Sequence, residues 1–219
     1  GYMLRCFLEE AEEEIGIKLI DISANTVTLN VAEKVVADGE SMDRAEFREY
    51  LTSCAGTEKQ MVRYCVDENN EIKKIDFPEE CSDLRMFEYQ PENDKLTKYR
   101  FDADTFLYRS ASNSCMPYFN LAGTMIFKVP TDPADAEYSV VGESSSVLID
   151  NTSYNLAVYD LNEAGTPAVA VLEFDPSTDK PNWKDKSYIV EKVVEEINNE
   201  GEATRKVVCW SDGNYYNLY

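Results

Sequence analysis

Histidine is absent from this chain of 219 residues, and its absence removes several kinds of catalytic and metal site. A Ser-His-Asp triad, a Cys-His pair, a histidine-ligated zinc site and an HExxH motif all need an imidazole. Mechanisms based on two carboxylates or on a lysine remain open. With 42 Asp and Glu residues, carboxylate pairs arise in any case, and no pair stands out by an apolar neighbourhood that would raise its pKa. We therefore expect a protein that is not an enzyme.

Basic residues are scarce, with 21 Lys and Arg against 42 acidic residues and a formal charge of −21. Phosphate backbones and anionic membranes would be repelled, and no basic stripe interrupts the acidity. No apolar run approaches the roughly 18–20 residues that span a bilayer, and no signal-peptide pattern occurs. The sequence thus predicts no nucleic-acid partner and no membrane insertion. Because the chain begins with Gly1 and not with Met, we expect a piece of a longer protein.

Cysteines are few and show no metal-binding or redox spacing. There is no CxxC, and six cysteines are too sparse for a small disulfide scaffold. Some lie in apolar strand-like runs, as in residues 64–66 and 208–210, which favours buried free thiols that behave as small hydrophobes. Pairing into disulfides stays open for the six residues, which are Cys6, Cys54, Cys65, Cys81, Cys115 and Cys209.

Alternation of apolar and polar residues is the commonest pattern, in short runs separated by turn formers. Residues 17–22 and 26–30 read as one hairpin, and 61–66 with 72–76 as another, while Asp38-Gly39 signals a turn. Many short strands with few helices predict an all-β fold, mainly an antiparallel small barrel or sandwich, with one or two short helices. Further strands are expected at residues 85–89, 95–101, 105–109, 123–129, 138–141, 154–159 and 168–174.

Two segments have helical spacing. Leu4, Leu8, Ala11 and Ile15 recur at helical intervals before Gly16, which predicts a short acidic helix in residues 1–16. A second short helix is expected in residues 42–51, with Ser41 as its N-cap.

The C-terminal stretch is ambiguous at first, because VEKVVEEI fits either a helix or a strand. The turn formers of residues 198–201, the strand-like RKVVCW and a second turn at 211–214 favour a three-stranded meander. The predicted organisation is therefore a lead-in helix in 1–16, a main β-rich domain in 17–185, and a meander in 186–219. The meander either packs on the main domain or starts a next module.

Acidic loops suggest calcium, the cofactor that acidic surface proteins often recruit. Two segments begin like EF-hand loops, but Ile72 replaces the required glycine in one, and Val171 replaces the bidentate glutamate in the other. Asp132, Asp135 and Glu137 remain as candidate ligands of a weak Ca²⁺ site, although an ordinary acidic loop is the simpler interpretation of this segment. No other cofactor is expected.

Aromatic residues gather toward the C-terminal end. Tyrosine and tryptophan offer flat apolar faces with a polar tip, which suit a glycan ring or a partner surface, although core and inter-domain packing is the simpler explanation. The candidate binding residues are Trp183, Trp210, Tyr215 and Tyr216.

The order of five segments resembles the β-rich repeat regions of clostridial, Gram-positive surface proteins of the S-layer-homology type. The segments are MVRYCVDENNEIKKIDF, GTMIFKVP, EYSVV, YNLAVYDLNEAGTPAVAVLEF and YIVEKVVEEINNEGEATRKVVCWSDGNYY. The resemblance covers roughly residues 17–219, although the chain contains no S-layer homology motif and has more cysteines than the resemblance implies.

The resemblance implies a secreted, extracellular structural module. Its partners would be neighbouring modules of the same protein or cell-wall components. We therefore expect a non-catalytic spacer, with a glycan- or protein-binding β module that uses the C-terminal aromatics as the alternative.

Overall fold

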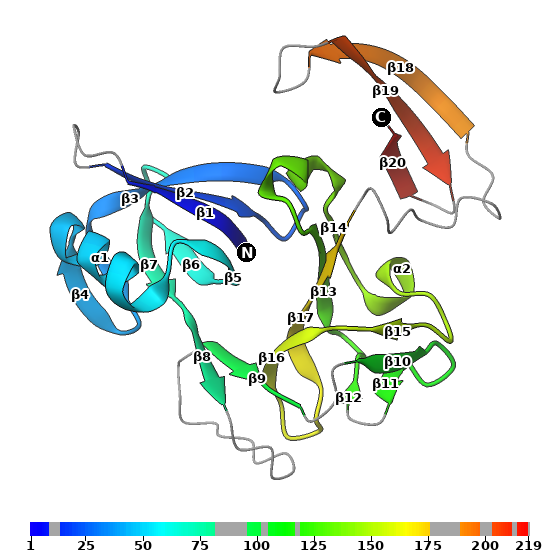
Figure 1. Cartoon of the computed structure of the whole chain (residues 1–219), viewed down its shortest axis with the longest axis horizontal. Coiled ribbons are helices and arrows are strands. Elements are labelled where there is room, and N and C mark those ends of the chain that lie inside the picture. The colour runs from blue at the N-terminus through cyan, green and yellow to red at the C-terminus, as the bar shows by residue number, and fades with distance from the viewer. Residues whose placement is uncertain are drawn as a thin grey trace. The chain divides into compact units, whose positions relative to one another are not determined.

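The chain is mostly β, with 55% strand and 14% helix, which confirms the predicted all-β class with short helices. It divides into two compact units, Gly1–Pro176 and Ser177–Tyr219 (Figure 1). The boundary predicted after residue 185 lies outside the described residues. This computed structural model describes residues 1–8, 14–81, 96–101, 105–116, 119–175, 189–197, 203–211 and 214–218.

The first sheet of the N-terminal unit has seven strands in the order β5-β1-β2-β3-β7-β6, with β4 paired to β3. Neighbouring strands are antiparallel except β3 and β7, which are parallel. The strands are β1 (Tyr2–Leu8), β2 (Ile15–Ile20), β3 (Thr26–Ala37), β4 (Glu40–Asp43), β5 (Glu58–Met61), β6 (Arg63–Val66) and β7 (Ile72–Asp76).

The helix predicted in residues 1–16 was wrong, because Tyr2–Leu8 is the strand β1. Tyr2, Met3 and Leu4 are buried in succession: Met3 packs in the core of the first sheet, whereas Tyr2 and Leu4 pack in a second cluster. A strand buried on both faces loses the simple alternation that marks a half-exposed strand. Its pairing with β2 and β5 overrides the helical spacing of its leucines.

Three strand connections use the same five-residue turn. The first side chain of each turn accepts hydrogen bonds from the backbone N–H groups two and four residues later. The fourth residue has a positive φ, as at Asn70 (64°) and Gly165 (70°). The need for such an Asx turn explains why Asp or Asn begins each of these loops. The turns are Asp21–Asn25, Asp67–Glu71 and Asn162–Thr166.

Asp38 and Gly39 form the predicted tight turn between β3 and β4. Their φ angles are 47° and 90°, and Ala37 pairs with Glu40 across the ladder. Two successive positive φ angles are typical of the two-residue hairpin turn that follows the twist of the strands.

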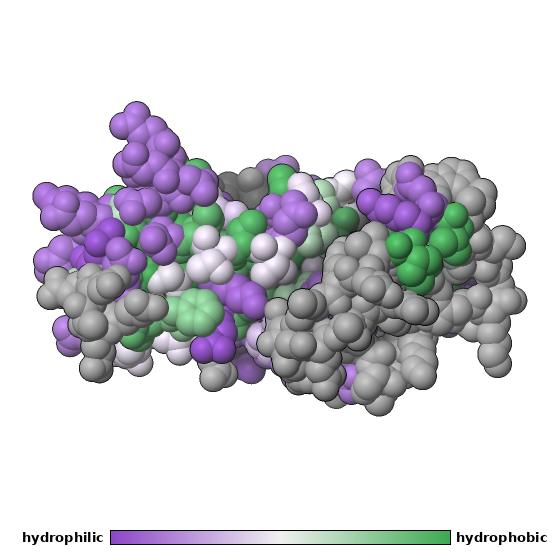
Figure 2. Space-filling view, turned by 90° about the horizontal axis from the view of Figure 1, so that it is seen from above, coloured by the Kyte–Doolittle hydropathy of each residue, from purple (hydrophilic) through white to green (hydrophobic). Residues whose placement is uncertain are grey.

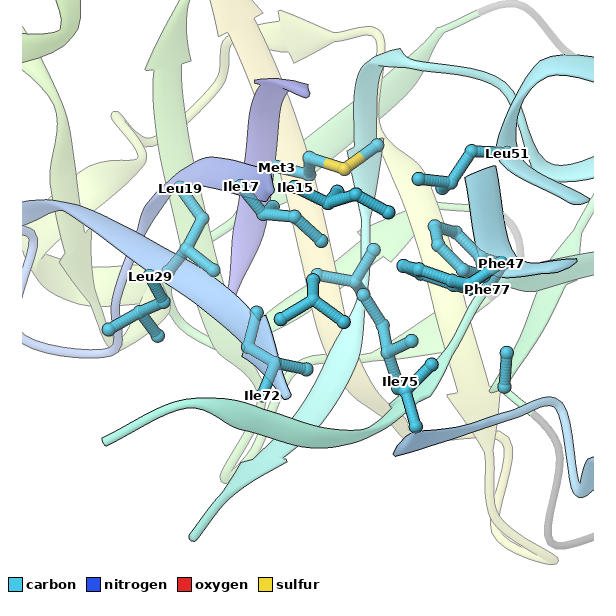
Figure 3. Packing of buried hydrophobic residues seen from close by; sticks show 14 residues of the cluster. Met3, Ile15, Ile17, Leu19, Leu29, Phe47, Leu51, Ile72, Ile75 and Phe77 are labelled. Atoms are coloured by element: carbon cyan, nitrogen blue, oxygen red, sulfur yellow. The ribbon is translucent and has the colours of Figure 1, made fainter. Parts of the chain in front are cut away.

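One face of the first sheet is covered by α1 (Arg44–Tyr50) and the π-helical turn η1 (Leu51–Ala55). Phe47 and Leu51 are fully buried against the sheet, and the rings of Phe47 and Phe77 lie 6.4 Å apart (Figure 3). The N-cap of α1 is Asp43 and not the predicted Ser41. Asp43 and Glu46 form a complete capping box, so the Asp-x-x-Glu spacing is the signal that matters here.

A second sheet, in the order β14-β13-β17-β16-β9-β8, is buried on both faces in its central strands. Ala170 and Leu172 of β17 lie in one apolar cluster, whereas Val171 lies in another. Burial on both sides explains the nearly continuous apolar run of β17. The strands are β8 (Pro78–Cys81), β9 (Leu96–Tyr99), β13 (Met125–Pro130), β14 (Val140–Gly142), β16 (Ala157–Leu161) and β17 (Pro167–Phe174).

A small sheet, in the order β12-β11-β10-β15, covers part of one face of the second sheet. Phe106, Phe119 and Cys115 from this sheet share an apolar cluster with Val158 and Ala170. The 3₁₀ segment η2 (Pro133–Tyr138) and the short helix α2 (Ser144–Val147) flank β14. The small sheet contains β10 (Phe106–Arg109), β11 (Ser114–Met116), β12 (Phe119–Asn120) and β15 (Ser153–Tyr154).

The C-terminal unit is an antiparallel sheet of β18 (Ile189–Ile197), β19 (Ala203–Ser211) and β20 (Asn214–Leu218). The segment that fits either a helix or a strand is therefore a strand, paired from Ile189–Trp210 to Ile197–Ala203. The predicted strand at 85–89 falls outside the described residues.

The surface mixes hydrophilic and apolar residues, as Figure 2 shows for one face. Large exposed apolar side chains include Ile22 (69% exposed) and Ile149 (58%), which lie in connections between elements, and Val190 and Val193 (56% each), which both lie in β18. Among the described residues, none of the helices has the length and apolar character needed to cross a bilayer.

Candidate functional site

A row of side chains crosses one face of the second sheet. Glu80 of β8 pairs with Lys98 of β9, Lys98 pairs with Tyr159 of β16, and Tyr159 pairs with Val169 of β17. Residues directly opposite one another in a ladder project from the same face. Strand pairing therefore places an acid, a base and a phenol side by side, although they are far apart in the sequence.

The first sheet meets this face through β1 and β5. Tyr2 shares a buried cluster with Phe127, Tyr159 and Val171 of the second sheet, and Lys59 donates a hydrogen bond to the backbone oxygen of Thr131 at 2.7 Å. Beside this shared cluster lies a cavity of about 480 Å³. It is lined by Tyr2, Lys59, Gln60, Pro78, Glu80, Lys98, Asn155, Ala157, Tyr159, Val171 and Glu173.

The two carboxylates of the cavity are held by partners from different strands. Glu173 accepts a 2.6 Å hydrogen bond from the Tyr2 hydroxyl, and its second oxygen lies 3.7 Å from Lys59 Nζ. Glu80 lies 3.1 Å from Lys98 Nζ. The contact between Glu173 and Tyr2 ties the second sheet to the first, so the cavity is built jointly by both.

Both phenols of the cavity hold their protons at neutral pH. Burial, followed by the charge of Glu173, raises the pKa of Tyr159 to about 12. Burial also raises the pKa of Tyr2 above its ordinary value, and the hydrogen bond to Glu173 adds to this effect. A neutral phenol can donate and accept hydrogen bonds but is a poor base. The arrangement is therefore suited to holding a polar molecule.

The residues predicted to bind calcium lie in η2 and its cap. Asp132 is the N-cap, and its carboxylate accepts a hydrogen bond from the backbone N–H of Ala134 at 2.8 Å. Burial and the neighbouring carboxylates of Asp132 and Asp175 raise the pKa of Asp135, whereas Glu137 is exposed. In the described part of the chain, no three His, Cys, Asp or Glu residues are grouped to hold a metal ion. The geometry thus gives the predicted calcium site no support.

The predicted aromatic site is only partly described. Trp183 lies outside the described residues. Trp210 of β19 is paired with Tyr215 of β20, and Cys209 is paired with Tyr216. Strand pairing therefore makes three of the four candidates near neighbours in the backbone.

The cysteines differ in exposure. Cys115 is fully buried, in agreement with the predicted buried free thiols, and burial raises its pKa to about 12. Cys54 and Cys65 are free but exposed, so the prediction of burial was wrong for these two. Cys65 lies in β6, at the edge of the first sheet, where one face of the strand is open to solvent.

The cavity residues were missed by sequence reasoning. Glu80 and Glu173 are two of 42 acids, and no local pattern distinguishes them. The usable signal is that Glu173 interrupts the apolar run PAVAVLEF, which marks a charged group on a largely buried strand. Comparisons with family models, with curated proteins and with solved structures find no match. The chemistry of the site therefore has to be argued from its own residues.

Proposed function

We propose that this chain is a non-catalytic structural module of a bacterial cell-surface protein of the S-layer type. The observation that best supports the proposal is the division of the chain into two successive compact β units. A spacer needs consecutive folded bodies with packed interiors, and it needs no reactive group. Its partners would be neighbouring modules of the same protein or cell-wall components, and its location would be extracellular.

The interior of the N-terminal unit fits this role. Within the described residues, no buried side-chain nitrogen or oxygen lacks a hydrogen-bond partner. Buried Asp76 is held by Arg63 at 3.1 Å and by Lys74 at 3.8 Å. Buried polar groups whose hydrogen bonds are all made favour one defined structure over alternatives. A module that bears load or fixes spacing requires such a structure.

Surface labelling of intact cells of the source organism tests the proposal. An amine-reactive reagent that cannot cross membranes is applied to intact and to lysed cells, and peptides of this chain are quantified by mass spectrometry. Exposed lysines such as Lys73 are expected to be labelled on intact cells as fully as in lysates. Labelling only after lysis would exclude a surface location.

A further inference from the structure

We propose that the cavity between the two sheets of the N-terminal unit binds a neutral saccharide. This binding function goes beyond the structural role and does not depend on it. The cavity is formed by β1 and β5 on one side and by β8, β9, β16 and β17 on the other. Its volume of about 480 Å³ falls in the range of about 300–1,000 Å³ typical of small-molecule sites.

The charge of the cavity favours a neutral ligand. Its charged lining residues are two lysines and two glutamates, so the formal sum is zero in a chain that carries −21. Lys98 lies 3.1 Å from Glu80, and Lys59 lies 3.7 Å from Glu173. A cation would meet the two ammonium groups and an anion would meet the two carboxylates. A ligand with a net charge would have to disturb these pairs, whereas a neutral one would not.

The polar groups of the cavity suit hydroxyl groups, which both donate and accept hydrogen bonds. Gln60 Nε2 donates to the backbone oxygen of Ala55 at 2.7 Å, which orients the amide and leaves its carbonyl oxygen as an acceptor. Asn155 is exposed and offers both a donor and an acceptor. Each lysine ammonium group has three donors, more than are used by the contacts of Lys59 with Glu173 and the Thr131 backbone oxygen, or by the contact of Lys98 with Glu80. Mixed donors and acceptors without net charge match the array of hydroxyls on a sugar ring.

Apolar surface supplies the second requirement of a sugar site. Half-buried Pro78 and Ala157 contribute most of the accessible apolar lining, because Tyr2, Tyr159 and Val171 also line the cavity but are only 2–4% exposed. The C–H groups on a sugar face can pack against such surfaces, while the hydroxyls at the ring edge reach the polar side chains. An ion would contact only the polar side chains of this lining, and a purely apolar molecule would contact only its apolar groups.

NMR titration of the isotopically labelled full chain tests the proposal. The probes are three neutral disaccharides, cellobiose, maltose and N,N′-diacetylchitobiose, each added to millimolar excess. Glucuronate and glucosamine serve as the anionic and cationic probes. We expect at least one disaccharide to shift the amide signals of β5, β9 and β16, and the charged probes to leave them unchanged.

Matched variants locate the binding. Lys98→Ala and Asn155→Ala are expected to weaken it about tenfold each, the effect of losing one or two polar contacts. The controls Lys73→Ala and Asn30→Ala replace the same residue types at exposed positions outside the cavity, and both should bind as the unaltered chain does. Unchanged amide spectra without sugar verify the fold of each variant. The proposal is overturned if no disaccharide shifts the cavity signals, if the charged probes bind equally well, or if the control variants lose binding too.

Discussion

At the scale of single residues, burial decides the chemistry of groups that look alike in the sequence. Cys115 is surrounded by the cluster that joins the small sheet to the second sheet, whereas Cys65 lies exposed on an edge strand. Thiols react as thiolates, so a raised pKa and a lack of access both slow modification. We therefore expect Cys65 to be accessible to thiol reagents and Cys115 to be protected from them.

Timed alkylation of the native protein should reveal this difference. Iodoacetamide at mildly alkaline pH is expected to modify Cys54 and Cys65 first. Cys115 should react only after unfolding, because burial raises its pKa to about 12 and removes it from solvent. Peptide mass spectrometry measures each site, and labelling in denaturant serves as the control. Equal rates at Cys65 and Cys115 in the native protein would contradict the buried position of Cys115.

At the scale of elements, caps and turns depend on short spacings that can be found in the sequence only if the correct first residue is chosen. Counting from Ser41 gives an incomplete capping box, whereas counting from Asp43 gives Asp-x-x-Glu, and the structure uses the second. Asp43 accepts a hydrogen bond from the Glu46 N–H at 2.9 Å, and Glu46 accepts one from the Asp43 N–H at 3.0 Å. Phe47, which follows directly, is buried in the core of the first sheet.

Asp43→Ala is expected to lower the free energy of unfolding by about 1 kcal/mol, within the usual range of about 0.5–2 kcal/mol for loss of an N-cap. The matched variant Ser41→Ala should change it by no more than about 0.5 kcal/mol, because Ser41 lies in the exposed strand β4. Urea denaturation of both variants measures the difference. A larger loss of stability for Ser41→Ala than for Asp43→Ala would show that Ser41 is the N-cap, as predicted from the sequence.

At the scale of the N-terminal unit, one shared cluster makes the two main sheets a single body. Leu4 and Ile20 come from the first sheet, and Phe127 and Val171 come from the second, yet all four are buried in that cluster. The hydrogen bond from Tyr2 to Glu173 crosses the same junction. Neither sheet can lose this contact without exposing apolar surface of the other.

Leu4→Ala should therefore loosen both sheets. We expect a loss of about 2–5 kcal/mol in the free energy of unfolding, as is usual for a buried leucine. Hydrogen exchange followed by mass spectrometry should show faster exchange in β2 and β3 as well as in β13 and β17. Ile149→Ala, at a position 58% exposed, is the control. Faster exchange confined to the first sheet would show that the sheets unfold separately.

The sequence by itself determined the class of fold and most local turns. Alternation of apolar and polar residues and β-branched runs marked the hairpins, and Asp38-Gly39 marked a two-residue turn. The absence of histidine excluded catalytic and metal sites that need an imidazole. These features depend on interactions within a few residues, so a short window of sequence contains them.

The tertiary structure alone decided the rest. Residues 2–8 form a strand because β2 and β5 pair with them. The spacing of apolar residues within the segment contains no information about these partner strands. The cavity arises in the same way, since Glu80, Lys98 and Glu173 meet only after strands distant in the sequence have paired and the two sheets have packed. Long-range pairing and burial on both faces leave no fixed spacing in the sequence, and this is the physical reason that the site could be found only in the folded chain.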